Sequence, residues 1–146
     1  MLDLQRAGVK DHGVVTGFLE AVWGWYPDID RDRWDWVVAE LLDSDSWMFL
    51  LAYHEGEPAG LAVVSWRLTL YGSREEGRLE AVLVVEERRH EGVGSALMEA
   101  VLNAARRRGC RELEVALPMD AEGALSFFKR FEFREEKRLL VWPCAD

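Results

Sequence analysis

The stretch from Leu79 to Gly109 constrains the fold more than any other part of the sequence. The β-branched residues at 82–85 favour a buried strand. A charged turn with two glycines follows, and from Gly92 onward apolar side chains recur at the spacing of one helical face. Three arginines and then Gly109 suit the carboxyl end of a helix. The stretch therefore predicts a strand–turn–helix unit around which the chain is organised.

The turn from Arg89 to Gly94 carries the chemistry of this unit. Glycine has no Cβ and lets a ligand approach the backbone closely, and the unpaired N–H groups at a helix start favour an anion such as phosphate. A tight strand-to-helix turn without a ligand is the alternative interpretation. Two common nucleotide motifs are excluded, because Leu97 stands where a Rossmann fingerprint needs a small residue and no Gly-Lys-Ser/Thr is present.

The pattern Val82-x-Val84 followed by Arg89-x-x-Gly92-x-Gly94 resembles the acetyl-coenzyme A motif of the GNAT superfamily of N-acetyltransferases. The resemblance implies that the strand lies along the pantetheine arm of acetyl-CoA, the co-substrate, and that backbone amides of the turn wrap its pyrophosphate. The cofactor-binding residues that it implies are Val82, Val84, Arg89, His90, Glu91, Gly92, Val93, Gly94 and Ser95. Glu91, beside Glu86 and Glu87, is unusual for the family and suggests a modest affinity for coenzyme A, partly offset by Arg88, Arg89 and His90.

The rest of the chain supplies elements in the GNAT order, βααβββαβαβ. We expect strands at Leu2–Ala7, Trp47–Tyr53, Ala59–Trp66, Glu112–Leu117 and Phe133–Trp142, helices capped by Asp11 and Asp120, and a helix that begins at Asp30. This order predicts an α/β (α+β) fold with a mixed, mostly antiparallel central sheet of six to seven strands and about four helices. We expect one GNAT-like acyl-CoA-binding domain over residues 1–146.

Charge and composition bound the partners. The 18 basic and 27 acidic residues give a net charge of −9, which disfavours nucleic acid and anionic membranes and favours a cationic acceptor such as an amine. Acidity that serves only solubility is the alternative. No apolar run approaches a membrane span and no signal-peptide core is present, so we expect a soluble, cytoplasmic protein. The two cysteines lack metal-ligand spacing, so no metal is expected, and the surplus of aromatic residues is compatible with a homodimer.

Aromatic and acidic residues alternate between positions 25 and 36 and could hold the ammonium group of an acceptor. They are Trp25, Tyr26, Trp34 and Trp36 with Asp28, Asp30, Asp32 and Asp35. Tryptophans at helical spacing are also typical of a core, which is the alternative. His54, beside the hairpin turn, is expected to be a solvated loop residue.

Glu80 is the candidate general base. An alkyl amine has a pKa of about 10.4 and must lose a proton before it attacks the thioester. Glu80 stands two residues before Val82, so strict alternation predicts the same strand face for both, and the resemblance places acidic bases near this part of the strand. An exposed strand-end carboxylate without a role is the alternative. A backbone N–H near Val84 could donate to the thioester carbonyl, as the family does.

Phe128 occupies the position where many GNAT relatives have a tyrosine that protonates the leaving thiolate. A phenyl ring cannot donate a proton, and Tyr71 and Tyr53 are the candidate substitutes. The sequence thus favours an N-acetyltransferase that acts on a primary amine of a small molecule or protein. The alternative is a catalytically weakened acyl-CoA-binding or regulatory domain. The acceptor, the acyl-chain preference and the oligomeric state are not encoded in any motif.

Overall fold

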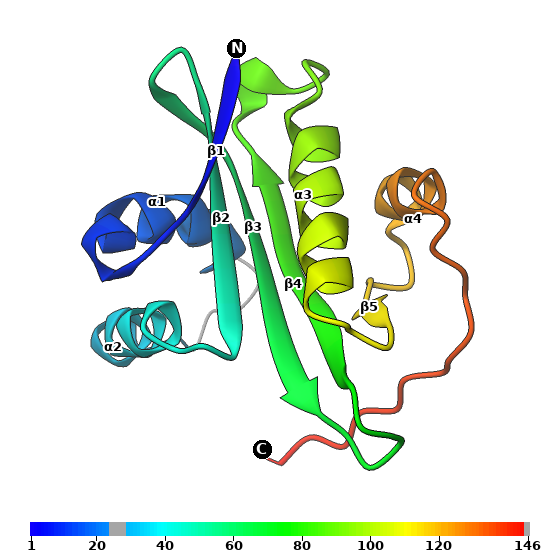
Figure 1. Ribbon diagram of the computed structural model, residues 1–146. Coiled ribbons are helices and arrows are strands. Elements are labelled where there is room, and N and C mark those ends of the chain that lie inside the picture. The colour runs from blue at the N-terminus through cyan, green and yellow to red at the C-terminus, as the bar shows by residue number, and fades with distance from the viewer. Residues whose placement is uncertain (24–28, 145–146) are drawn as a thin grey trace. The chain divides into compact units, whose positions relative to one another are not determined.

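Four consecutive strands form most of a five-stranded sheet in the computed structural model, which describes residues 1–23 and 29–144 (Figure 1). They are β1 (Leu2–Arg6), β2 (Trp47–His54), β3 (Glu57–Leu68) and β4 (Glu75–Val84), each antiparallel to the next. The hairpin predicted between the second and third strands is confirmed, and it turns at Glu55 and Gly56, both in the left-handed region.

The fifth strand, β5 (Leu113–Val115), is shorter than expected and lies next to β4. The Arg111 N–H donates to the Glu75 carbonyl and the Gly77 N–H donates to the Glu112 carbonyl, at 2.8 and 2.9 Å. These bonds advance in the same direction along both segments, as in a parallel pair. The expected mixed sheet is therefore confirmed, with five strands instead of six to seven.

Helices cover both faces of the sheet in the first of two units into which the chain divides, Met1–Glu114 (Figure 1). On one face lies a buried cluster, called here the α1–α2 cluster. It contains Val15 of α1 (His12–Trp23), Val38 and Leu42 of α2 (Arg31–Leu42), and Leu61 and Val63 of β3. The other face packs against α3 (Val93–Arg107). None of the described helices has the length and apolar character needed to span a membrane.

The expected helix starts have mixed outcomes. The helix expected to begin at Asp30 is α2, and Asp30 is its N-cap, because its carboxylate accepts the Arg33 N–H at 3.2 Å. Asp11 belongs to the short helix η1 (Val9–Asp11) and accepts the Gly8 N–H, so it closes the turn before α1. The expected cap at Asp120 is wrong: α4 (Glu122–Lys129) follows Ala121, and Asp120 contributes only its carbonyl, to the Glu122 N–H.

The second unit, Val115–Asp146, holds α4 and the segment after it. The strand expected at Phe133–Trp142 is wrong, because residues 133–143 adopt neither helix nor strand. The physical reason lies in the sequence: five consecutive charged residues at 134–138 interrupt the alternation that a half-buried strand needs. The apolar residues after them, 139–142, are all exposed.

Candidate active site

The turn after β4 leads the chain into α3 through two left-handed residues. The short helix η2 (Glu86–Arg88) comes first, and the Arg88 and Arg89 N–H groups donate to the Val85 and Glu86 carbonyls. His90 and Gly92 then have φ of 67° and 83°. Nothing lies within 4 Å of a Cβ built on Gly92, so the backbone there faces open space. Glycine suits this position for both its φ and its open approach.

The start of α3 presents backbone donors. Its N-cap, Gly92, has no side chain to accept a hydrogen bond, and the Ala96 N–H is the one that returns to the Gly92 carbonyl, at 3.0 Å. The N–H groups of Val93, Gly94 and Ser95 therefore precede the first intrahelical bond and point out of the helix end. Together with the dipole of this 15-residue helix, they make a fitting site for an anionic group.

The acidic residue in this turn is neutralised locally. Arg88 Nη1 lies 3.6 Å from Glu91 Oε2, and both side chains are partly exposed. Arg89 and His90 are exposed. The ion pair with Arg88 therefore reduces the repulsion that Glu91 would exert on a bound anion.

Close packing against Gly60 of β3 fixes where α3 begins. A Cβ built on Gly60 would lie 2.8 Å from Val93 Cγ1 and 3.0 Å from both Leu97 Cδ1 and the Leu83 carbonyl oxygen. Val93 and Leu97 are fully buried. The position of the helix N-terminus therefore depends on the missing side chain at Gly60.

Backbone N–H groups near the end of β4 alternate in direction, and two of them point away from β3. The Val85 N–H donates to the Ala59 carbonyl at 2.9 Å, which points it toward β3. Because successive N–H groups of an extended strand alternate in direction, those of Val84 and Val82 point to the opposite edge. The side chains of these two valines pair with Gly60 and Ala62 and so lie on the face that packs against α3.

A β-bulge changes the position of Glu80. Val63 pairs with Ala81 and Val64 pairs with Leu79, so Glu80 has no partner residue on β3. Its Oε2 accepts the Ser65 hydroxyl at 2.6 Å, and Ser65 shares the face of Val63, which packs against α1 and α2. The expectation that Glu80 shares the face of Val82 is wrong, because an extra residue shifts the alternation by one.

The arginines near Glu80 on the sheet are paired with other glutamates. Glu114 accepts hydrogen bonds from Arg67 and Arg78 at 3.0 and 2.9 Å. Partial burial raises the pKa of Glu114, but the hydrogen bonds from Arg78 and Arg67 together outweigh it and hold that pKa below 4.5. The buried Glu76 lies 3.7 Å from Arg67 and 3.3 Å from Arg111. These arginines are thus occupied by carboxylates other than Glu80.

The sequence matches a family model over most of its length. The model is that of the Acetyltransferase (GNAT) family, and it covers residues 11–133. The chain belongs to the GNAT acetyltransferase family.

Individual GNAT relatives agree with this assignment. An uncharacterized N-acetyltransferase of Methanocaldococcus jannaschii is 26% identical over 86% of the chain, which spans 58% of that relative's length. An aminoglycoside N(6′)-acetyltransferase type 1 of Stenotrophomonas maltophilia is 31% identical over 82% of the chain and 79% of its own length. The fold is similar to that of an aminoglycoside N-acetyltransferase solved with a bisubstrate analogue, with a TM-score of 0.83, 21% identity and coverage of 100% and 99%.

The two candidate proton donors, Tyr71 and Tyr53, lie in different parts of the first unit. Tyr71 is 74% exposed, in the connection that precedes β4, whereas the glycine turn follows the other end of that strand. Tyr53 lies on β2, two strands from β4, packed against the α1–α2 cluster. Phe128 is buried in the second unit, with Phe127 and Phe133 rings edge-on at 5.2 and 5.4 Å. Their catalytic roles stay predictions.

The aromatic and acidic segment is only partly described. Trp25, Tyr26 and Asp28 lie outside the described residues. Trp34 packs against the α1–α2 cluster, which favours the core interpretation for that residue. Trp36 is 58% exposed, and the Arg33 guanidinium lies 5.8 Å from its ring centre. His54 is half-buried at the end of β2, less solvated than expected.

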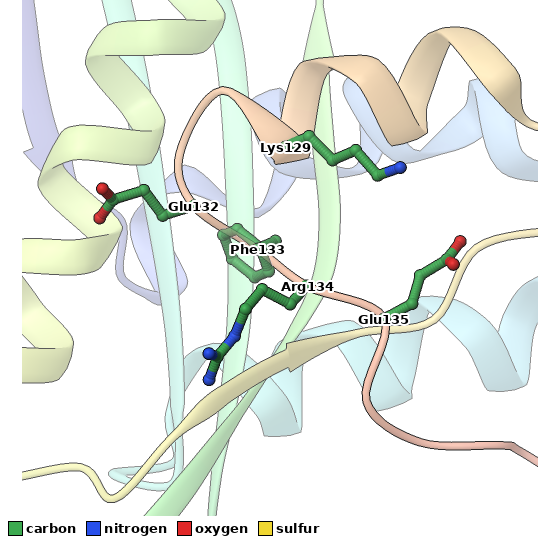
Figure 2. Close-up of a pocket in the computed structure, with 5 residues that line it drawn as sticks. All are labelled: Lys129, Glu132, Phe133, Arg134 and Glu135. Carbon is green, nitrogen blue, oxygen red and sulfur yellow. The ribbon is translucent and has the colours of Figure 1, made fainter.

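The second unit carries an open pocket whose lining includes none of the residues predicted for the GNAT site. It is lined by Lys129, Glu132, Phe133, Arg134 and Glu135. Figure 2 shows the charged side chains pointing in different directions instead of converging on one point. This pocket therefore lacks the arrangement of a binding site for one small group.

Two features of this GNAT site were missed by sequence reasoning. One is Ser65, whose only signal is a hydroxyl within the apolar run Ala59–Trp66. The other is the bulge at Glu80, which leaves no mark in the sequence because the residues on both sides continue a strand pattern.

Proposed function

We propose that this GNAT protein transfers an acetyl group from acetyl-CoA to a primary amine, with a cationic small molecule as the favoured acceptor. The observation that carries the proposal is the start of α3, where uncapped N–H groups follow an open, left-handed Gly92. Within the GNAT family, whose resemblance assigns this turn to the pyrophosphate, these donors suit the negative charge of coenzyme A.

The donor side uses backbone and cationic groups. The N–H groups of Val93, Gly94 and Ser95 bind the pyrophosphate oxygens, and the exposed Arg89 adds positive charge. The edge of β4 that carries the Val84 N–H receives the pantetheine arm. That N–H donates to the thioester carbonyl oxygen and stabilises the charge that develops there.

The acceptor side requires proton removal. Glu80 accepts a proton from the ammonium group of the acceptor, and the freed nitrogen attacks the carbonyl carbon of the thioester. The carbon–sulfur bond breaks, the thiolate leaves with the electron pair, and the second proton of the attacking nitrogen passes through water to the thiolate. A thiol has a pKa of about 8.5, so it leaves without the assistance that an alkoxide would need.

The acceptor class is supported by relatives and by charge. The Stenotrophomonas relative is named for acetylation of aminoglycosides, and solved structures of similar fold contain coenzyme A or sisomicin. Aminoglycosides carry several amines and are cationic at neutral pH. A chain with a net charge of −9 attracts such a molecule.

A binding domain without turnover is the second candidate, and Phe128 is the observation that favours it. Its ring is buried and has no hydroxyl at the position of the family's general acid. A panel of amines with acetyl-CoA, followed by release of free thiol, separates the two candidates. Turnover with any amine supports the enzyme; stabilisation by acetyl-CoA with no turnover on any amine contradicts it.

The donor site itself is tested by adding a carboxylate to the helix start. Asp in the first turn is favourable to a helix, so Gly94→Asp should fold normally while repelling the pyrophosphate. Gly123→Asp is the matched control, because Gly123 is the second residue of α4 as Gly94 is of α3. Saturating acetyl-CoA, at about 100 times its dissociation constant, stabilises a fold by about 2.7 kcal/mol. We expect this stabilisation in the unmodified protein and in Gly123→Asp. Its retention in Gly94→Asp would show that the pyrophosphate binds elsewhere.

A further inference from the structure

We propose that Ser65 is a positioning residue that holds the Glu80 carboxylate in place for proton removal, an inference that rests on the proposed acetyl transfer. The two residues belong to different strands and are brought together by the bulge in β4. Ser65 makes no contact with the reacting atoms in this proposal. It acts only through Glu80.

The hydrogen bond has the length of a charge-assisted bond. The distance from Ser65 Oγ to Glu80 Oε2 is 2.6 Å, and hydroxyl-to-carboxylate bonds of 2.5–2.7 Å belong to this stronger class. Ser65 lies between the buried Val64 and Trp66 in β3, so its own backbone is held firmly. A fixed donor therefore restrains the end of a flexible side chain.

Glu80 needs such a restraint because the bulge leaves it without a cross-strand neighbour. Its side chain is exposed, and an exposed glutamate with three rotatable bonds populates several rotamers. A general base must lie within hydrogen-bond distance of the proton that it accepts. Restricting the carboxylate to one position therefore raises the fraction of molecules that are ready to react.

The nearby cations leave Glu80 free for this role. Arg67 and Arg78 lie on the same part of the sheet, but their guanidinium groups bind Glu114. Within residues 1–23 and 29–144, Glu80 Oε1 has no hydrogen bond or ion pair with another side chain. One oxygen thus holds the carboxylate in position while the other is available to an ammonium group.

A double-mutant cycle tests the proposal. The variants are Ser65→Ala, Glu80→Gln and the double variant, and Ser65→Thr serves as the conservative control that keeps the hydroxyl. We expect Ser65→Ala to lower kcat about ten-fold or more, the size of one lost hydrogen bond to a charged group. KM for acetyl-CoA should not change. Ser65→Thr should recover most of the loss, and Ser65→Ala should have no further effect when Glu80→Gln is already present.

The outcomes separate this inference from the function on which it rests. If the effects of Ser65→Ala and Glu80→Gln on kcat multiply, Ser65 acts independently of Glu80 and the inference is wrong, while acetyl transfer stands. If Ser65→Ala lowers the melting temperature and Ser65→Thr fails to restore kcat, the role of Ser65 is structural. If the unmodified protein turns over no amine although acetyl-CoA stabilises it, the proposed function fails and the role of Ser65 fails with it.

Discussion

Phe128 is the residue whose chemistry differs most from what the GNAT resemblance implies. Its ring is 6% exposed and packs among other phenylalanines of the second unit. Phe128→Tyr would supply a phenol with a pKa of about 10, able to protonate the departing thiolate. We expect kcat to rise about three- to ten-fold, less than the usual gain from a general acid because a thiolate already leaves easily. Steady-state thiol release measures the change.

The matched control for this substitution is Phe127→Tyr. Phe127 precedes Phe128 on α4 and its ring contacts Phe131, so the hydroxyl is added to the neighbouring ring of the same helix, which is less buried. A buried hydroxyl without a partner costs about 1–3 kcal/mol, so the melting temperature of Phe128→Tyr should fall. An equal rise in kcat for both variants would mean that the effect does not depend on the position of the family's tyrosine.

At the scale of secondary-structure elements, the contact of α3 with β3 links fold to function. Gly60→Ala would place a methyl group 2.8 Å from Val93 Cγ1 and 3.0 Å from the Leu83 carbonyl oxygen. The Leu83 carbonyl oxygen belongs to the backbone and cannot move away as a flexible side chain can. Val93 must therefore move, and the start of α3 shifts with it. We expect the free energy of unfolding to fall by about 1–3 kcal/mol. The affinity for acetyl-CoA should also weaken, as measured by calorimetry at a temperature where the variant is folded.

Gly17→Ala is the control for the effect of adding a methyl group to a glycine. Gly17 lies within α1, and nothing is within 4 Å of its added Cβ. That substitution should stabilise the helix by about 0.5–1 kcal/mol and leave the affinity for acetyl-CoA unchanged. If Gly60→Ala keeps full affinity, the turn positions its donors independently of this contact.

The elements that the sequence predicted well are those with a local physical signature. The stretch from Leu79 to Gly109 is one, because hydrophobic periodicity and the left-handed Gly109 mark both ends of α3. Features that depend on pairing between distant residues were missed. The bulge at Glu80 is such a feature, because it arises from the register of β4 on β3. The strand expected after Phe133 was wrong for another reason, since the charged run at 134–138 that interrupts the alternation is visible in the sequence itself. The glycine turn was thus predictable, whereas the face on which Glu80 lies was not.

At the scale of the whole molecule, net charge shapes the approach of an acceptor. The excess of 27 acidic over 18 basic residues gives a negative field, and Arg67 of β3, Arg78 of β4 and Arg108 just after α3 are paired with glutamates. In the proposed function, coenzyme A, an anion, therefore depends on the local donors at the start of α3. A cationic acceptor is attracted by the molecule as a whole.

This difference predicts opposite responses of the two substrates to salt. The Debye length falls from about 30 Å at 0.01 M to about 10 Å at 0.1 M ionic strength, which screens long-range attraction and repulsion alike. We expect kcat/KM for an aminoglycoside such as sisomicin to fall several-fold over this range, while kcat/KM for an uncharged aromatic amine stays within about two-fold. KM for acetyl-CoA should stay constant or decrease, since repulsion from the acidic surface is screened. Equal salt dependence for the charged and uncharged amines would contradict electrostatic selection of the acceptor, and would leave its recognition to contacts within the site.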